Sequence, residues 1–219
     1  MPAAADRRPL SRDRVLEGAI RVADRDGAAA ITMRRIAREL GVEAMSLYHH
    51  LPNKDAVLDG VVDAVFAKIE LPGGDEDWRA AIRASAHSAR AVLSRHSWAL
   101  GLMDSRRHPG PATVRRHDAF LGVLRRGGFS LPMAAHAISL IDSYVDGYVL
   151  QEANLPISTT ADLEEVAGGI LDELATADLP YLTEMIVDHA LRPGYDHRRE
   201  FGFGLELILD ALESRRAAP

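Results

Sequence analysis

The stretch ARELGVEAMSLYHHLPNK, residues 37–54, gathers side chains that could contact nucleic acid. After Glu43 it carries no formal charge until Lys54, and its hydroxyl groups and imidazole rings can donate and accept hydrogen bonds. A helix in the DNA major groove needs such a surface, because base edges present hydrogen-bonding groups and thymine methyls. The side chains suited to base edges or nearby backbone are Ala44, Met45, Ser46, Tyr48, His49 and His50.

Cations flank this stretch rather than interrupt it. Arg34 precedes it and Lys54 ends it, so both would lie where phosphates approach. Helices predicted to begin at Thr32 and Asn53 would add backbone N–H donors for phosphate. Because phosphate contacts position a protein on DNA and base contacts specify the sequence, this arrangement predicts double-stranded DNA as a partner.

A turn between two short helices would present these residues. The apolar pattern around Leu40 predicts a helix that starts at Thr32 and stops at Gly41, where glycine permits a left-handed turn. A further helix is expected over 44–50, before Pro52. The pair forms a predicted helix-turn-helix, although many helical hairpins share this pattern.

The rest of the chain also has helical periodicity, and no stretch alternates as a strand would, so we expect an all-α fold. Ser11 and Asn53 are predicted N-caps of the helices on either side of the helix-turn-helix. The break LPGGDED predicts a boundary between a DNA-binding domain with its linking helix, residues 1–70, and a ligand-binding and dimerisation domain, residues 71–219. Helices in the second domain are expected over 77–94, 97–104, 111–127, 131–153, 162–176, 179–190 and 198–216.

Composition narrows the function classes. The net charge is −6, but residues 1–54 hold 10 basic and 7 acidic side chains, so the N-terminal end is mildly basic. Cysteine is absent, which excludes disulfides and thiolate metal sites. No apolar run is long enough to span a bilayer and no secretory signal is recognisable, so we expect a cytoplasmic protein without membrane contact.

The segment ITMRRIARELGVEAMSLYHHLPNKDAVLDGV resembles the DNA-binding head of the tetracycline-repressor family of bacterial transcription regulators. GFSLPMAAHAISLIDSYVDGYVLQE and FGFGLELILDALE are similar to body helices of the tetracycline repressors themselves, whereas residues 157–178 match poorly. The resemblance implies a repressor released from operator DNA by a small-molecule effector, with helix 54–70 linking head and body. The DNA contacts that it implies are Thr32, Arg34, Ala44, Met45, Ser46, Tyr48, His49, His50 and Lys54.

Family members are dimers, and the periodicity of two helices agrees with this. Helix 198–216 is apolar around much of its circumference, more than one face on its own domain requires. Helix 131–153 shows the same excess. We expect a homodimer through both, with glycines at 202 and 204 permitting close helix approach. The apolar side chains of helix 198–216 are Phe201, Phe203, Leu205, Leu207, Ile208, Leu209 and Leu212.

A ligand pocket is expected inside the body, for a small organic effector of apolar or aromatic character and without a cofactor. Aromatic and methionine side chains at helical spacing are common in plain cores, so the liners are candidates only. Asp142 and Asp146 share a helix face and could hold a cationic ligand or form a polar stripe at the dimer seam. The candidate liners are Trp98, Leu102, Met103, Phe120, Leu124, Tyr144, Tyr148 and Gln151.

Two other function classes are the alternatives. A helical-bundle enzyme could use acid–base pairs such as Asp188/His189 and Asp196/His197, but no nucleophile elbow, phosphate loop or two-histidine metal motif accompanies them. A protein-binding adaptor without DNA activity could also use a helix-turn-helix. We therefore predict no enzyme activity and no catalytic or metal site.

The effector is not expected to be magnesium–tetracycline. Tetracycline repressors hold the ion with a histidine and a glutamate, and the resemblance aligns Leu102 and Gln151 with these positions. Leucine cannot ligate a cation and a neutral amide brings no charge to offset it. His108 and Glu152 lie nearby and could supply ligands if the alignment shifts.

Overall fold

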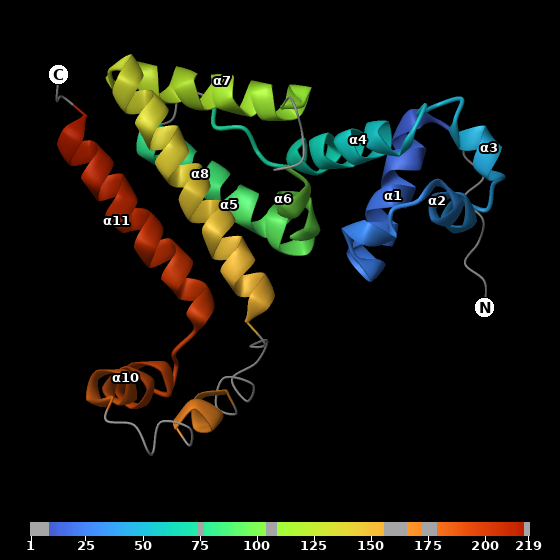
Figure 1. Cartoon of the computed structure of the whole chain (residues 1–219). Helices are drawn as coiled ribbons and strands as arrows, with labels where there is room; N and C mark the ends of the chain where they lie inside the picture. The colour runs from blue at the N-terminus through green and yellow to red at the C-terminus, as the bar shows by residue number, and fades with distance from the viewer. Residues whose placement is uncertain (1–8, 74–76, 104–108, 156–165, 172–178, 217–219) are drawn as a thin grey trace.

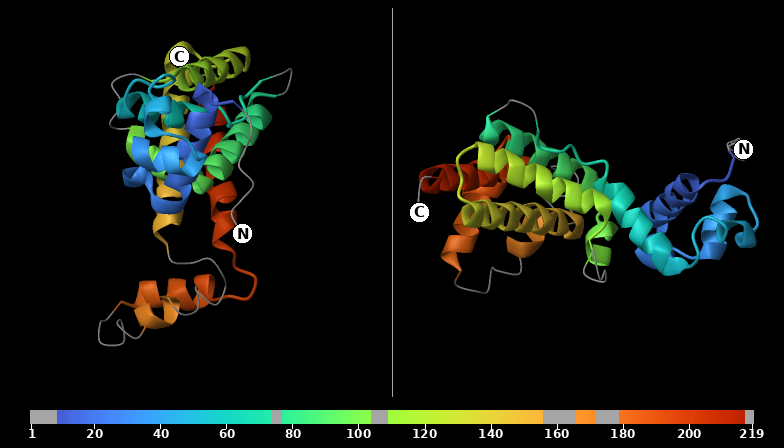
Figure 2. Two further views of the ribbon diagram at one scale, coloured as in Figure 1. Left: turned by 90° about the vertical axis from the view of Figure 1, so that its right-hand side faces the viewer. Right: turned by 90° about the horizontal axis from the view of Figure 1, so that it is seen from above.

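The computed structural model describes residues 9–73, 77–103, 109–155, 166–171 and 179–216. These residues form helices and no strand, as the periodicity predicted. Figure 1 shows a head of α1, α2 and α3 at one end, a larger helical body at the other, and α4 running from one to the other. The view from above in Figure 2 shows the same elongated arrangement.

The head consists of short helices with side-chain caps. Its helices are α1 (Arg12–Asp26), the 3₁₀ turn η1 (Ala28–Ala30), α2 (Met33–Leu40) and α3 (Ala44–Leu47), followed by α4 (Lys54–Phe66). The predicted caps are confirmed: Ser11, Thr32 and Asn53 each accept a hydrogen bond from a backbone N–H in the following first turn. Such a cap stabilises a helix by about 1 kcal/mol.

The helix-turn-helix is formed by α2, the turn at Gly41 and α3. Gly41 adopts φ 67° and ψ 35°, the left-handed conformation that glycine was predicted to allow. The recognition helix is shorter than the predicted 44–50, because regular α-helix ends at Leu47 and residues 48–50 continue as turns. Pro52 cannot continue a helix, and Asn53 must be extended to cap α4, so the chain leaves the helix early.

The body helices follow the predicted ranges closely. They are α5 (Trp78–Arg95), α6 (Trp98–Met103), α7 (Pro111–Arg126), α8 (Leu131–Asn154), α10 (Pro180–Met185) and α11 (Glu200–Arg215). The helix expected over 179–190 changes at Ile186 to a π-helical turn, η2 (Ile186–Ala190), and the 3₁₀ turn η3 (His197–Arg199) precedes α11. Residues 166–171 are helical, and the rest of the predicted helix 162–176 lies outside the described residues.

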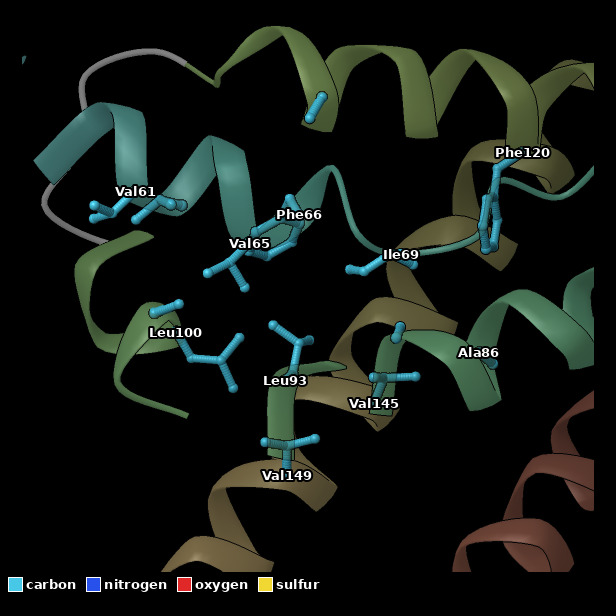
Figure 3. Packing of buried hydrophobic residues seen from close by; sticks show 14 of the residues in the cluster. Val61, Val65, Phe66, Ile69, Ala86, Leu93, Leu100, Phe120, Val145 and Val149 are labelled. Atoms are coloured by element: carbon cyan, nitrogen blue, oxygen red, sulfur yellow. The ribbon is translucent and has the colours of Figure 1, made fainter. Parts of the chain in front are cut away.

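One hydrophobic core runs through head and body by way of α4. Val61, Val65 and Phe66 of α4 are buried, and Figure 3 shows them facing Leu93 of α5 and Leu100 of α6. The division at residue 70 therefore stays a prediction, since the linking helix belongs to the core on both sides. A movement of α4 must repack side chains at the head and in the body together.

The apolar side chains of α11 divide into a buried and an exposed face. Phe201, Leu205, Leu209 and Leu212 are buried within the same chain, so they belong to the body core. Phe203 and Leu207 are 66% and 56% exposed. Of the predicted set, these two remain as the strongly exposed members.

Gly204 also serves the chain's own packing. A Cβ at Gly204 would lie 2.3 Å from the Tyr144 hydroxyl, so this glycine allows α8 and α11 to approach each other within one subunit. At Gly202 no such neighbour is present within 4 Å. Only Gly202 thus remains open to the predicted approach of a second chain.

No helix of the described residues is long and apolar enough to cross a membrane.

Candidate DNA-binding surface and ligand cavity

The recognition helix, α3 with the turn after it, has one face buried in the head and the other exposed to solvent. Leu47 is fully buried, whereas Met45 is 73% and Tyr48 44% exposed. His49 is also exposed, and Ala44, Ser46 and His50 are half-buried. A methionine this exposed gains nothing from the core, so its position fits contact with a partner such as a thymine methyl.

Cations around the recognition helix divide into neutralised and unneutralised groups. Arg21 and Arg25 pair with Glu39 at 2.9 and 3.1 Å, and Arg35 pairs with Asp26 at 3.3 Å. Arg34 and Lys54 are exposed, and neither forms an ion pair with a residue that the structure describes. Positive charge therefore remains where phosphates were predicted to lie.

Thr32 is the N-cap of α2, as predicted, and its DNA contact stays a prediction. Its Oγ1 accepts a hydrogen bond of 3.2 Å from the Arg35 backbone N–H. The hydroxyl oxygen accepts this bond while its O–H remains able to donate, so the Thr32 hydroxyl and the first-turn N–H groups of α2 are both donors for phosphate.

A small cavity lies where α4, α5, α7 and α8 meet. Its volume is about 30 Å³. Phe66, the last residue of α4, and Ile69, in the turn after it, form part of its wall, so the cavity adjoins the helix that carries the head. The other lining residues are Ala89, Leu93, Met103, Thr113, Arg116, His117, Asp142, Val145 and Asp146.

The polar side of this cavity is a charge cluster around a buried arginine. The Arg116 side chain is 6% exposed, and its Nη1 lies 2.8 Å from Asp142 Oδ1. His117 Nε2 lies 3.5 Å from the other carboxylate oxygen, and His117 Nδ1 donates to the Thr113 carbonyl at 3.0 Å. With an acceptor at each ring nitrogen, His117 is placed to carry both protons.

The pKa values follow from these contacts. Burial by itself would raise the pKa of Asp142, but the His117 hydrogen bond and the Arg116 charge hold it below its usual range. The hydrogen bond with Asp142 raises the pKa of His117. Asp142, one of the two aspartates predicted to share a face, is thus paired with Arg116 inside its own chain.

An open groove lies against the same cluster on the outside of α7 and α8. It has a volume of about 490 Å³ and is lined by Leu121, Ala135, Ile138, Ser139 and Ser143 together with His117, Asp142 and Asp146. These last three residues also line the buried cavity. The charge cluster therefore separates the groove from the cavity.

The comparisons with known proteins identify both halves of the chain. Residues 15–61 match the family model "Bacterial regulatory proteins, tetR family", and residues 71–216 match "Tetracyclin repressor-like, C-terminal domain". The chain belongs to the TetR family. Members of the TetR family are DNA-binding transcription regulators that respond to small molecules, and they are not enzymes.

Named relatives of this TetR-family regulator include repressors. The HTH-type transcriptional repressor DrrR1 of Streptomyces coeruleorubidus is 36% identical over 97% of this chain and 80% of the relative. The class A tetracycline repressor of Escherichia coli is 30% identical over 94% of this chain and 92% of the relative. ActR of Streptomyces coelicolor in complex with actinorhodin superposes with a TM-score of 0.75 at 27% identity, covering 96% of this chain and all of ActR.

The predicted liners do not gather around the cavity of this TetR-family regulator. Met103 lines it, but Phe120 and Leu124 are fully buried in the core, and Gln151 is exposed. Leu102 is half-buried against the core. The lining thus remains a prediction for most of these residues.

Three other predicted liners are committed to hydrogen bonds elsewhere. Trp98 Nε1 donates to Asp24 of α1 at 2.8 Å, so this indole faces the head. The hydroxyls of Tyr144 and Tyr148 donate to the carbonyls of Phe201 and His197 at 2.9 and 2.7 Å. Burial raises the pKa of Tyr148 to about 12, which keeps its hydroxyl protonated as a donor.

Sequence reasoning missed Arg116, although a signal for it existed. The buried residues of α7 include Ala112, Thr113, Arg116, Phe120 and Val123, so Arg116 falls on the apolar stripe of its helix. An arginine on a buried stripe needs a partner, because an unpaired buried charge is costly. Asp142, noted in the sequence as an acid within an apolar helix, is that partner.

Glu152, named above as a possible metal ligand, forms an ion pair with Arg90 of the same chain. Its carboxylate accepts hydrogen bonds from both Nε and Nη2 of Arg90, the first at 3.0 Å. The Arg90 guanidinium lies over the Tyr148 ring, 5.0 Å from its centre. His108 lies outside the described residues.

Proposed function

We propose that this chain forms a homodimeric repressor that leaves its operator when a small organic molecule, without a metal ion, enters the body. The observation that carries the proposal is the position of α4. Phe66 at its end and Ile69 in the turn that follows line the buried cavity, and Asn53 caps its start next to the recognition helix. One rigid helix thus connects a ligand site to the DNA-binding surface.

The size of the cavity determines how an effector would act. A volume of about 30 Å³ has room for little more than a water molecule, whereas pockets for drug-sized ligands measure about 300–1,000 Å³. An effector therefore has to push the walls apart, and Phe66 and Ile69 are among the walls. Since the open cavity binds the ligand better than the closed one, binding shifts the protein toward a state with α4 displaced.

The lining indicates an amphiphilic effector. Phe66, Leu93, Met103 and Val145 offer apolar surface. The lining also has a polar side: Arg116 Nε is buried and has no hydrogen-bond partner among the described residues, so an acceptor oxygen on the effector would satisfy it. ActR, which binds actinorhodin, is the structural relative that supports a small-molecule effector.

A dimer is supported by two exposed stripes of small and apolar residues. On α8, Leu140, Ser143, Gly147 and Leu150 are exposed at helical spacing. On α11, Phe203, Leu207 and Ala211 are exposed at intervals of four residues. Pairing these stripes in two chains would bury them and would place two recognition helices for two half-sites.

The DNA surface is tested by selecting bound duplexes from a random pool and then measuring variants on the selected site. Lys54→Ala should weaken every sequence about equally and reduce the slope of log affinity against log salt by about one, because it removes one phosphate contact. Tyr48→Phe should instead alter preference at one position, since a base contact is worth about 1–3 kcal/mol.

Arg126→Ala is the control for Lys54→Ala, because Arg126 is an exposed cation at the C-terminal end of α7, in the body. It should leave the salt slope unchanged. If Lys54→Ala and Tyr48→Phe both behaved like this control on the selected site, the assignment of the recognition surface would be wrong.

Tetracycline should not act as effector, with or without Mg²⁺. Leu102 cannot ligate a cation, Gln151 is exposed, and the Glu152 carboxylate is held by Arg90. Calorimetric titration with tetracycline at millimolar Mg²⁺ is expected to give no more heat than titration with EDTA present. Tight magnesium-dependent binding that also released the selected DNA would contradict a metal-free effector.

A further inference from the structure

A second connection between head and body does not involve the packing of α4. Asp24 Oδ1, in the last turn of α1, lies 2.6 Å from His96 Nδ1 and 2.8 Å from Trp98 Nε1. His96 caps the end of α5 and Trp98 begins α6, so both belong to the body. One carboxylate oxygen of the head thus receives two hydrogen bonds from the body.

Lys68 is the fourth member of this cluster, and its contact with His96 determines the tautomer of the imidazole ring. Lys68 Nζ lies 3.2 Å from His96 Nε2. An ammonium group can only donate, so Nε2 accepts and the ring proton resides on Nδ1, from which it is donated to Asp24. We call Asp24, Lys68, His96 and Trp98 the head–body clasp.

The position of Asp24 in α1 indicates that its favourable contribution comes from the hydrogen bonds to His96 and Trp98. A carboxylate in the last turn of a helix is disfavoured by the helix dipole, which prefers cations there. His96 is 9% exposed, so its polar ring depends on these partners. Hydrogen bonds to a charged group are also stronger and more directional than those between neutral groups.

We propose that the head–body clasp sets the orientation of each head relative to its body, and that Asp24 and Trp98 are positioning residues for operator binding. The head is otherwise held by the packing of α4 against α1 and by the contact of η1 with α6, and such packing tolerates small rotations. The clasp adds directional hydrogen bonds from α1, which restrict these rotations. The consequence for operator spacing rests on the proposed dimer.

The chain provides a matched control for Trp98. Trp78, the other of its two tryptophans, also donates its indole N–H to a carboxylate, Glu213, at 3.1 Å. This bond joins α5 to α11 and lies wholly within the body. Trp98→Phe and Trp78→Phe therefore remove similar hydrogen bonds, but only the first removes a link to the head.

The orientation can be measured directly because the chain has no cysteine. Arg38→Cys on the head and Arg115→Cys on α7 place spin labels at two exposed positions. Labelled protein is diluted with unlabelled protein, so that pulsed EPR reports the head–body distance within one chain whether or not the chain dimerises. Asp24→Ala and Trp98→Phe should each broaden this distance distribution, and Trp78→Phe should leave it unchanged.

Operator binding provides the readout that a purely stabilising contact would not change. On the selected site, Asp24→Ala should bind about tenfold more weakly, the equivalent of about 1.4 kcal/mol. On operators with half-sites moved apart by one base pair the loss should be several-fold smaller, because freer heads tolerate the wrong spacing. Trp78→Phe should keep the spacing preference of the natural chain.

Two results would overturn the proposal. One is a head–body distance distribution that stays unchanged in both Asp24→Ala and Trp98→Phe. The other is a loss of affinity that is equal at every spacing, which would make the clasp a stabilising contact only. Failure of the dimer proposal would be seen separately, as monomers in sedimentation, and would leave the EPR comparison intact.

Discussion

Glutamate at both Phe203 and Leu207 is expected to give folded monomers that have lost specific operator binding. Both side chains lie on the exposed side of α11, so the substitutions leave the chain's own core untouched. Four like charges across the proposed two-fold interface would be buried without partners, which prevents association. A monomer engages one half-site only, and the lost avidity should weaken binding by about 10²-fold or more.

The neighbouring position provides the control. Leu205 is two residues from Leu207 on the same helix but is fully buried in its own chain. Leu205→Glu should therefore abolish the cooperative unfolding transition, whereas Leu207→Glu should keep it. Analytical ultracentrifugation and circular dichroism of the two variants separate the outcomes. A stable dimer in the Phe203/Leu207 double variant would place the interface on another surface.

Removing the Asp142 carboxylate is expected to destabilise the body strongly. Asp142→Ala leaves the Arg116 guanidinium buried without its ion-pair partner, and breaking such a pair costs about 3–5 kcal/mol. Urea denaturation followed by circular dichroism should show this as a lower midpoint at an unchanged slope.

A double variant tests whether charge imbalance is the cause. Arg116→Met with Asp142→Leu removes both charges at similar volume and should recover most of the lost stability. The same variant removes the unpartnered Nε, so it should also lose selectivity for effectors that carry an acceptor oxygen. If Asp142→Ala were no less stable than the natural chain, the buried ion pair would not be what holds α7 to α8.

Local signals in the sequence determined where the helices of the head begin and end. Thr32, Gly41 and Asn53 act through hydrogen bonds or backbone dihedrals within a few residues, so their types alone predict where α2 ends and α4 begins. Helical periodicity likewise predicted the body helices within a few residues, because it depends on the spacing of apolar side chains along one chain. The exposure of Met45 and Tyr48 beside the buried Leu47 agrees with a recognition helix.

Periodicity could not decide what each apolar face packs against. On α11 the side chains of Leu205 and Leu207 have the same chemistry, yet one is buried in its own chain and the other is exposed. Only the tertiary fold makes that choice, by placing α8 against one side of the helix.

The partners of polar side chains were likewise decided by the tertiary structure. Trp98 resembled a pocket residue, but its indole N–H reaches Asp24, 74 residues earlier in the chain. Arg116 and Asp142 appeared as isolated charges on two helices until the packing of α7 against α8 brought them to 2.8 Å. Such contacts depend on the relative placement of whole helices, and that placement follows from the packing of the entire core rather than from the residues that meet.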